Sequence, residues 1–448
     1  LGRLEAIFSS IYLIPFVFGF AFICNLLDLQ YFSVITLAVV VVCIVLFSKD
    51  VKNIFGVALY ACFYIGDIAE NPNWLFYGIA IGIAVVSFIG FVIYKLVTDK
   101  KCRTIKNGKF YPALFISSVA FLLGGLIGNF KLLPFLATFG FCIVSVIFYW
   151  MAINFTKDLS DYLFKLFIIG AFLICLTIFA KNVELYMVGH VDFMIWGDIF
   201  TKAYIWPCAQ NINVCTLFIL MGLISCFFVN TNEKHEFLML VLACILLYFI
   251  IISTCRVTTT IGLISFVFLT IRMFANSKNR KKLIIAGAIL LAVAAAFVII
   301  NIRAVWYIIY SFVLKTFGAG DFNTSGRIDI WSWCLEKFLE FPIFGIGFIT
   351  DGSLPGVREN FNNFVLAHNT IIQWICSLGL IGVILMTIYY IRKYKIIAKG
   401  LKIVLGIALI VILIEVIGMF DQAPSMDIFV HLIIILCIGT IERKATEP

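Results

Sequence analysis

The chain has 448 residues, of which 63% are hydrophobic and only 13% are charged. A soluble domain would carry about twice that share of charged residues, so the composition excludes a soluble enzyme. The formal net charge of +9 is explained by the positions of the basic residues between apolar runs, and it does not indicate nucleic-acid binding.

Apolar runs of about 20 residues recur along the whole chain, and this is the length that a helix needs to cross a bilayer. Hydrocarbon offers the backbone no hydrogen-bond partners, so each run is predicted to be a helix. The sequence therefore predicts a single all-α, polytopic integral membrane domain over residues 1–448, with about fourteen transmembrane helices. The predicted spans are 6–27, 31–48, 54–69, 74–97, 110–128, 132–155, 162–180, 208–229, 236–254, 257–274, 283–302, 368–390, 403–419 and 427–441.

Basic residues gather between these spans on alternate connectors, namely the second, fourth, sixth, tenth and twelfth. Cytoplasmic loops of membrane proteins carry an excess of Lys and Arg. The pattern therefore predicts an even number of spans with both termini in the cytoplasm. The clusters are Lys49 with Lys52, 95–109, Lys157 with Lys165, 278–282 and 392–402.

Two long connectors then lie on the extracytoplasmic side, residues 181–207 and 303–367. Loops longer than about 15 residues usually have a function or are disordered. In the second loop, apolar residues at helical spacing follow Ser325, a plausible N-cap, and predict an amphipathic helix that begins near Arg327 and ends before Pro342. We expect this loop to cap an active site.

Two arginines are candidate ligands for an anion. Arg256 lies at the outer mouth of the ninth and tenth spans, where it is either an anchor that reaches the interface or a phosphate ligand. Arg327 would combine a guanidinium with the free amides and positive dipole end of a helix N-terminus. The alternative for Arg327 is a surface position paired with Asp329.

His368 closes the long loop and begins the twelfth predicted span. An imidazole titrates near neutral pH, so it can accept a proton from a hydroxyl group. The alternative is an interfacial histidine that caps a helix. Asn369 and Gln373 follow His368 and are candidate supporting residues.

Further polar residues are candidates for supporting roles. Glu415 and His431 lie inside predicted spans at similar depth below the hairpin at 421–424, where they could pair, and a functional and a structural pair both stay open. Arg303 and Arg358 lie in the long loop. The sequence contains no carboxylate cluster or cysteine pattern for a metal, so we expect neither a metal nor a cofactor.

Three stretches in combination resemble the O-antigen polymerase/ligase superfamily of bacterial envelope glycosyltransferases. They are ISTCRVTTT at 252–260, SGRIDIWSWCLEKFLEFPIFGIGF at 325–348 and AHNTIIQWICSLGLIG at 367–382. The upstream QNINVCTLFIL, which contains Asn213, is similar to the family's Asn-x-Asn stretch. Val257 departs from the pattern, because the family has a small Gly or Ala there. The resemblance covers about 205–390.

The resemblance implies a GT-C-like enzyme of the bacterial cytoplasmic membrane that joins sugars carried on undecaprenyl diphosphate at the extracytoplasmic face. Arg256 and Arg327 would bind the diphosphate, and His368 would be the base that activates the acceptor hydroxyl. We expect a polysaccharide polymerase, as in capsule or O-antigen synthesis, that is metal-independent and inverts the anomeric carbon. A flippase and a chain-length regulator would be its partner proteins.

Two alternatives remain. An O-antigen-type ligase would pass the same lipid-linked glycan to a different acceptor, and the motifs do not separate it from a polymerase. A lipid-linked oligosaccharide flippase would also suit the number of spans. Transporters, however, place polar sites at the midplane, within inverted repeats, whereas the charges here gather near the outer face and no repeat is visible.

Overall fold

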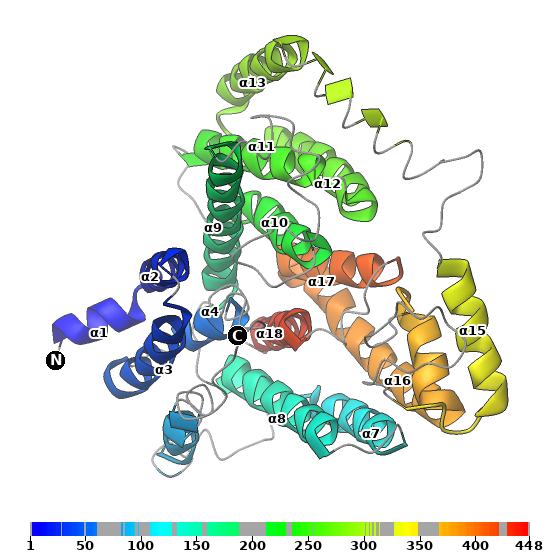
Figure 1. Ribbon diagram of the computed structural model, residues 1–448. Coiled ribbons are helices and arrows are strands. Elements are labelled where there is room, and N and C mark those ends of the chain that lie inside the picture. The colour runs from blue at the N-terminus through cyan, green and yellow to red at the C-terminus, as the bar shows by residue number, and fades with distance from the viewer. Residues whose placement is uncertain are drawn as a thin grey trace. The chain divides into compact units, whose positions relative to one another are not determined.

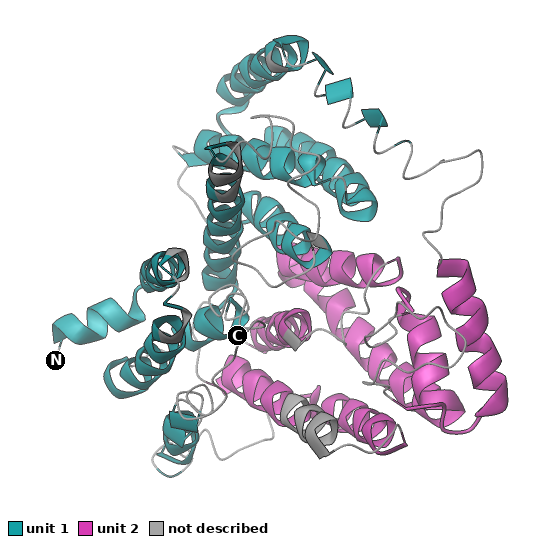
Figure 2. Ribbon diagram, in the orientation of Figure 1, with its two compact units in different colours: residues 1–100, 157–322 teal, residues 101–156, 323–448 magenta. Residues whose placement is uncertain are grey.

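The computed structural model is helical throughout its described residues (Figure 1). The chain divides into two compact units, residues 1–100 with 157–322 and residues 101–156 with 323–448 (Figure 2). The described residues are 2–27, 29–48, 51–60, 82–83, 86–94, 97, 108–127, 132–154, 159–187, 212–229, 235–253, 255–300, 302–303, 305–306, 309–310, 313, 327–347, 367–420 and 428–446.

Unit 1 consists of helices from the first and middle parts of the chain. Its largest helix-to-helix contact joins α9 and α10, and α10 also packs on α11 and α12. The helices are α1 (Gly2–Ser9), α2 (Leu13–Leu26), α3 (Gln30–Phe47), α4 (Asn53–Leu59), α9 (Leu159–Met187), α10 (Ile212–Cys226), α11 (Glu236–Ile252), α12 (Arg256–Asn276) and α13 (Arg280–Ile300).

Unit 2 carries the amphipathic helix that was predicted after Ser325 and the C-terminal helices. Here α16 is central, because it packs on α7, α15, α17 and α18. The helices are α7 (Tyr111–Ile127), α8 (Leu132–Asn154), α15 (Arg327–Glu340), α16 (Thr370–Ile403), α17 (Leu405–Gly418) and α18 (Ile428–Lys444). The amphipathic helix predicted to begin near Arg327 is confirmed as α15.

Several helices are suited to a membrane. Among the residues described, four are long and apolar enough to cross a bilayer, or five if the bent pair α1 and α2 is one span. Six shorter apolar helices accompany them. The helices confirm an all-α membrane protein, whereas the predicted number of about fourteen spans stays a prediction.

Three helices differ from the predicted spans. The first span is two helices, α1 and α2, bent by 74°. At this bend Asn53 Nδ2 donates to the carbonyls of Phe8 (2.7 Å) and Ser10 (2.8 Å), which satisfies backbone groups that a helix end leaves open. α9 continues to Met187, into the predicted loop 181–207, because no Gly or Pro interrupts it there.

The third difference concerns α16, which extends to Ile403 and includes the basic stretch that the sequence assigned to a connector. Arg392, Lys395 and Lys399 are exposed on this helix, whereas Lys393 is buried. The chain turns into α17 at Val404. The sequence prediction ended the span before this basic stretch because it read the positive charges as a connector. Three of these cations instead lie on the exposed face of the helical stretch that continues to Ile403.

Candidate active site

The helix that follows His368 is broken. α16 has non-helical backbone at Gly379 (φ 59°, ψ −163°), which divides it into a short arm (residues 370–378) and a long arm (residues 380–403). Only glycine adopts such backbone angles without a large steric cost. Breaking a helix leaves carbonyls open at the end of one arm and amides open at the start of the next.

The segment after α15, residues 341–347, supplies partners for the open groups and is called here the docking segment. The amides of Ile346 and Gly347 donate to the carbonyls of Cys376 (3.0 Å) and Ser377 (2.9 Å) at the end of the short arm. The carbonyls of Pro342 and Ile343 accept from the amides of Leu380 (2.9 Å) and Ile381 (3.1 Å) at the start of the long arm. The docking segment thereby seals the break.

The crossing of the two segments depends on two glycines. Gly345 also has a positive φ of 70°. A Cβ on Gly379 would lie 2.4 Å from the Gly345 amide nitrogen, and a Cβ on Gly345 would lie 2.6 Å from the Gly379 nitrogen. Atoms do not approach backbone this closely, so both positions require glycine. The glycine of the docking segment and the glycine of the helix break therefore depend on each other.

His368 lies in a turn that neighbouring side chains hold in place. Its backbone has a φ of 50°, a left-handed conformation that is uncommon for residues other than glycine. On one side of it, Trp331 Nε1 donates to the Ala367 carbonyl (2.6 Å), and the Ala367 amide donates to Gln373 Oε1 (2.8 Å). Gln373 in turn donates to Ser377 Oγ (2.9 Å). The turn is therefore fixed from both α15 and α16.

Asn369 caps the short arm, as its position next to a helix start suggests. Its Oδ1 accepts from the amides of Ile371 (2.9 Å) and Ile372 (3.1 Å), and its Nδ2 donates to the Met419 carbonyl (3.0 Å). Thr370 Oγ1 donates to the Gly418 carbonyl (2.8 Å). The start of α16 is thus attached to the C-terminal end of α17.

Arg327 reaches the same end of α17. Its Nη1 donates to the carbonyl of Phe420, the residue after Met419. Carbonyls at the end of a helix carry partial negative charge, which favours a cation there. Three consecutive carbonyls, those of residues 418–420, therefore bind Thr370, Asn369 and Arg327. The structure brings Arg327 and the His368 turn to one place within unit 2.

Buried apolar contacts support this arrangement. Ile330, Cys334, Ala367 and Cys376 form one buried cluster, with Trp331 packed against it. The cluster joins α15, the His368 turn and the short arm of α16. α15 therefore positions Arg327 through an apolar face as well as through hydrogen bonds.

In unit 1, Asn213 and Arg256 belong to a second local arrangement. Cys255 Sγ donates to Asn213 Oδ1 (3.1 Å) and lies 3.3 Å from Thr258 Oγ1. Cys255 has extended backbone and immediately precedes α12, whose first residue is Arg256. Asn213 thus holds the turn that places the Arg256 side chain at a helix N-terminus. The Asn-x-Asn stretch and the Cys-Arg stretch are in direct contact.

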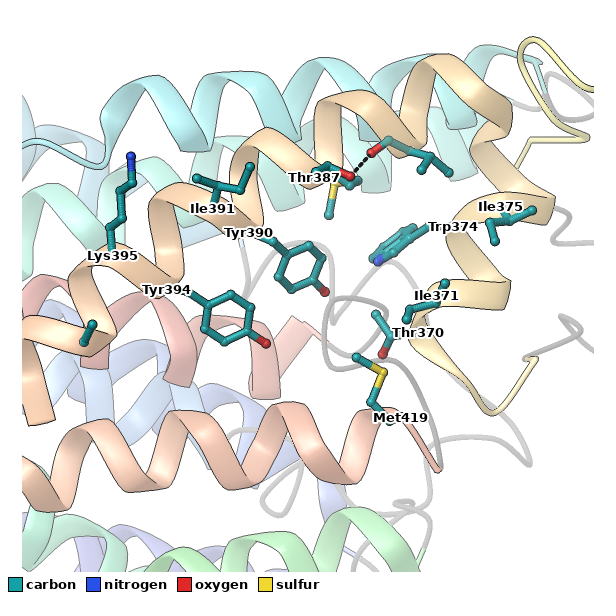
Figure 3. A pocket seen from close by; sticks show the side chains of 13 residues that line it. Thr370, Ile371, Trp374, Ile375, Thr387, Tyr390, Ile391, Tyr394, Lys395 and Met419 are labelled. Carbon is teal, nitrogen blue, oxygen red and sulfur yellow. Dashed lines mark hydrogen bonds between the residues drawn. The ribbon is translucent and has the colours of Figure 1, made fainter.

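A crevice opens between the arms of α16. It has a volume of about 670 Å³, and its wall is almost entirely apolar. Figure 3 shows Tyr390 and Tyr394 of the long arm and Trp374 of the short arm directed into it, with Met419 alongside. Thr370 lines the same end, next to the Asn369 cap. The crevice therefore begins beside the His368 turn.

The remaining candidates are distributed as follows. Glu415 forms its ion pair with Lys393, at 2.5 Å, and so the partner differs from the His431 that the sequence suggested. His431 is buried with its ring 6.4 Å from that of Phe121. Arg303 is described and exposed. Arg358 lies outside the described residues.

Sequence reasoning missed several residues of this site. Trp331, Gly379 and the end of α17 were given no role, and Gly345 was expected only to help end the amphipathic helix. Gly379 was detectable in principle as a weak point of the helix, because a glycine inside a helical pattern costs about 1 kcal/mol relative to alanine. The carbonyls of 418–420 carry no sequence signal, since any residue supplies a carbonyl.

The sequence profile of a family described as O-antigen ligase matches residues 219–387. This segment belongs to the O-antigen polymerase/ligase superfamily. The match includes Arg256, α15, the docking segment and the His368 turn. Members of the family are glycosyltransferase-like enzymes that act on lipid-linked glycans. The match and the apolar helices together point to a protein of the bacterial inner membrane. None of the curated proteins is significantly similar to the chain.

Proposed function

We propose that this O-antigen polymerase/ligase family protein is a polysaccharide polymerase. It transfers a growing glycan from undecaprenyl diphosphate to a sugar hydroxyl of another lipid-linked repeat unit, at the extracytoplasmic face. The observation that carries the proposal is the convergence of Arg327 and the His368 turn on residues 418–420, since Arg327 and His368 both lie in the segment that matches this family.

The donor's leaving group determines what the site has to supply. A departing diphosphate accumulates negative charge, and a preorganised guanidinium stabilises that charge strongly where water is scarce. Arg327 has five N–H donors in a planar fork, and one of them is fixed on the Phe420 carbonyl. The others can hold phosphate oxygens. Arg256, the first residue of α12, is the second diphosphate ligand that the resemblance implies.

His368 is the proposed general base. It takes the proton of the acceptor hydroxyl as that oxygen bonds to the anomeric carbon and the bond to the diphosphate breaks. Attack opposite the leaving group inverts the anomeric configuration, and the step requires no metal. The hydrogen bonds on Ala367 and Asn369 fix the backbone that carries the imidazole before the substrates bind.

The crevice between the arms of α16 suits the lipid part of the donor. Its apolar wall matches a polyprenyl chain, and it is lined by Thr370 and Met419, which are next in sequence to the Asn369 cap and to Phe420, whose carbonyl Arg327 binds. Helix breaks also occur in transporters, where they line ion sites. Here the backbone groups at the break are bonded to the docking segment, so the break shapes a crevice without offering a polar substrate site.

The test is transfer by purified protein from a defined undecaprenyl-diphosphate oligosaccharide, with product length read on a gel. Wild-type protein should extend the glycan, and His368→Ala should lower the rate by about a hundredfold or more, the usual contribution of a positioned base. His235→Ala is a matched control, because this exposed histidine precedes α11 in unit 1. Normal chain lengths from His368→Ala would exclude His368 as the base.

The same assay separates the polymerase from the ligase. A polymerase lengthens the lipid-linked glycan when the repeat unit is the only acceptor offered. A ligase leaves it unchanged and transfers it only when a different acceptor, such as a lipid A core sugar, is added.

A further inference from the structure

A buried ion pair in unit 2 takes no part in the proposed chemistry. Lys393 of α16 and Glu415 of α17 lie 2.5 Å apart, and their side chains are 1% and 4% exposed. Lys393 Nζ also lies 3.8 Å from the ring centroid of Tyr390 and 4.9 Å from that of Tyr389. Removing two opposite charges from water costs free energy, so a buried ion pair is weak evidence for stability. A role in specifying one structure explains such a pair better.

The location of the pair indicates that role. Glu415 is three residues before Gly418, and Gly418 begins the run of carbonyls that bind Thr370, Asn369 and Arg327. Lys393 belongs to the long arm of α16, whereas Thr370 and Asn369 lie at the start of the short arm. The end of α17 is therefore attached to the long arm by the ion pair and to the short arm and α15 by its carbonyls.

Apolar contacts alone would fix this position poorly. α17 is apolar along its length, and nine of its residues are buried. Apolar surfaces can slide past one another at little cost, whereas a buried charge has to meet its partner. The ion pair selects one register of α17 against α16.

We propose that Lys393 and Glu415 are positioning residues that set the register of α17, and through residues 418–420 the place of Arg327 relative to His368. This inference rests on the proposed function. The pair would affect the rate of glycan transfer although neither side chain contacts the substrate.

The test compares Glu415→Gln, Lys393→Met and the reversed pair Lys393→Glu with Glu415→Lys. Each single variant should lower kcat by about tenfold to a hundredfold while KM for the lipid donor changes little, because a displacement of about 1 Å has an effect of this size. The amides of Ile371 and Ile372, which Asn369 caps, should exchange hydrogen faster. The reversed pair should restore both kcat and slow exchange.

Glu442→Gln is the matched control. Glu442 is also buried, but it accepts from Tyr149 Oη (2.5 Å) and the Lys109 amide, neither of which belongs to α16 or α17. It should leave kcat and the exchange of these amides unchanged. Wild-type kcat and exchange in Glu415→Gln would overturn the proposal. So would a loss of activity without faster exchange.

If the single variants fail to fold, the reversed pair decides. Recovery of folded protein and kcat supports a register set by the pair, and no recovery refutes it. Hydrogen exchange requires no substrate. If wild-type protein transfers no glycan, the proposed function fails, while the exchange measurement still tests the positioning role.

Discussion

Substituting Gly379 should undo the crossing on which the candidate active site depends. In Gly379→Ala the new Cβ would lie 2.4 Å from the Gly345 nitrogen and 2.7 Å from the Ile343 carbonyl carbon and oxygen. These are backbone atoms and cannot turn away. An L residue at these backbone angles is also strained by about 1–3 kcal/mol. The docking segment therefore has to leave the break in α16.

When the docking segment leaves the break, the four hydrogen bonds between residues 342–347 and 376–381 are lost. At about 1 kcal/mol for each bond, the loss is about 4 kcal/mol. This corresponds to a factor of about 1000 in the equilibrium between the docked and released segment. The docking segment follows α15, and the short arm follows the His368 turn. Release of the docking segment should therefore displace α15 from the His368 turn and lower the rate of glycan transfer.

The assay is thermal unfolding of the purified variant together with the transfer rate. Gly19→Ala is the control, because a Cβ at this position in α2 has nothing within 4 Å. Alanine in a helix is usually slightly favourable relative to glycine, so this control should be neutral or a little more stable. A Gly379→Ala protein that melts and transfers glycan like the control would refute the reasoning.

Three further predictions concern the site. Arg327→Lys should impair transfer strongly, since an ammonium cannot replace a bidentate fork; full activity would indicate a structural arginine. Cys334 and Cys376 share a hydrogen bond that lowers the pKa of the Cys334 thiol, so a disulfide-forming reagent should join them. Mass spectrometry should find the Cys334–Cys376 disulfide in the wild-type protein and not in Cys334→Ser. A wild-type protein without this disulfide, or the same cross-linked product in Cys334→Ser, would contradict the docking of α15 on α16. Transfer should continue in a chelator of divalent cations, and a rate that depends on added metal would refute the metal-free mechanism.

Much of the helical architecture could be predicted, because membrane spans are the strongest signal in a sequence. The amphipathic pattern that follows Ser325 predicted α15 with its first residue, Arg327, since apolar periodicity marks a buried face. The sequence offered His368 as a possible helix cap, whereas the cap is Asn369, a residue type that favours this position. These features are local, and local chemistry determines them.

The features that the sequence did not reveal are long-range. Gly379 resembles any glycine in an apolar helix until Gly345 is seen against it. Lys393 resembles one more residue of a cytoplasmic cluster, and only the fold places Glu415, 22 residues later, within 2.5 Å of it. Register and crossing depend on contacts between distant segments, which periodicity and charge counts do not contain.

Arg327 and the His368 turn are proposed to serve one diphosphate site. The most direct measurement is an experimental structure of the full chain with undecaprenyl diphosphate bound. We expect diphosphate oxygens held by the Arg327 guanidinium, with the His368 imidazole facing the place of the acceptor hydroxyl and the lipid entering the crevice of α16. A diphosphate bound away from Arg327 and His368 would contradict this proposal.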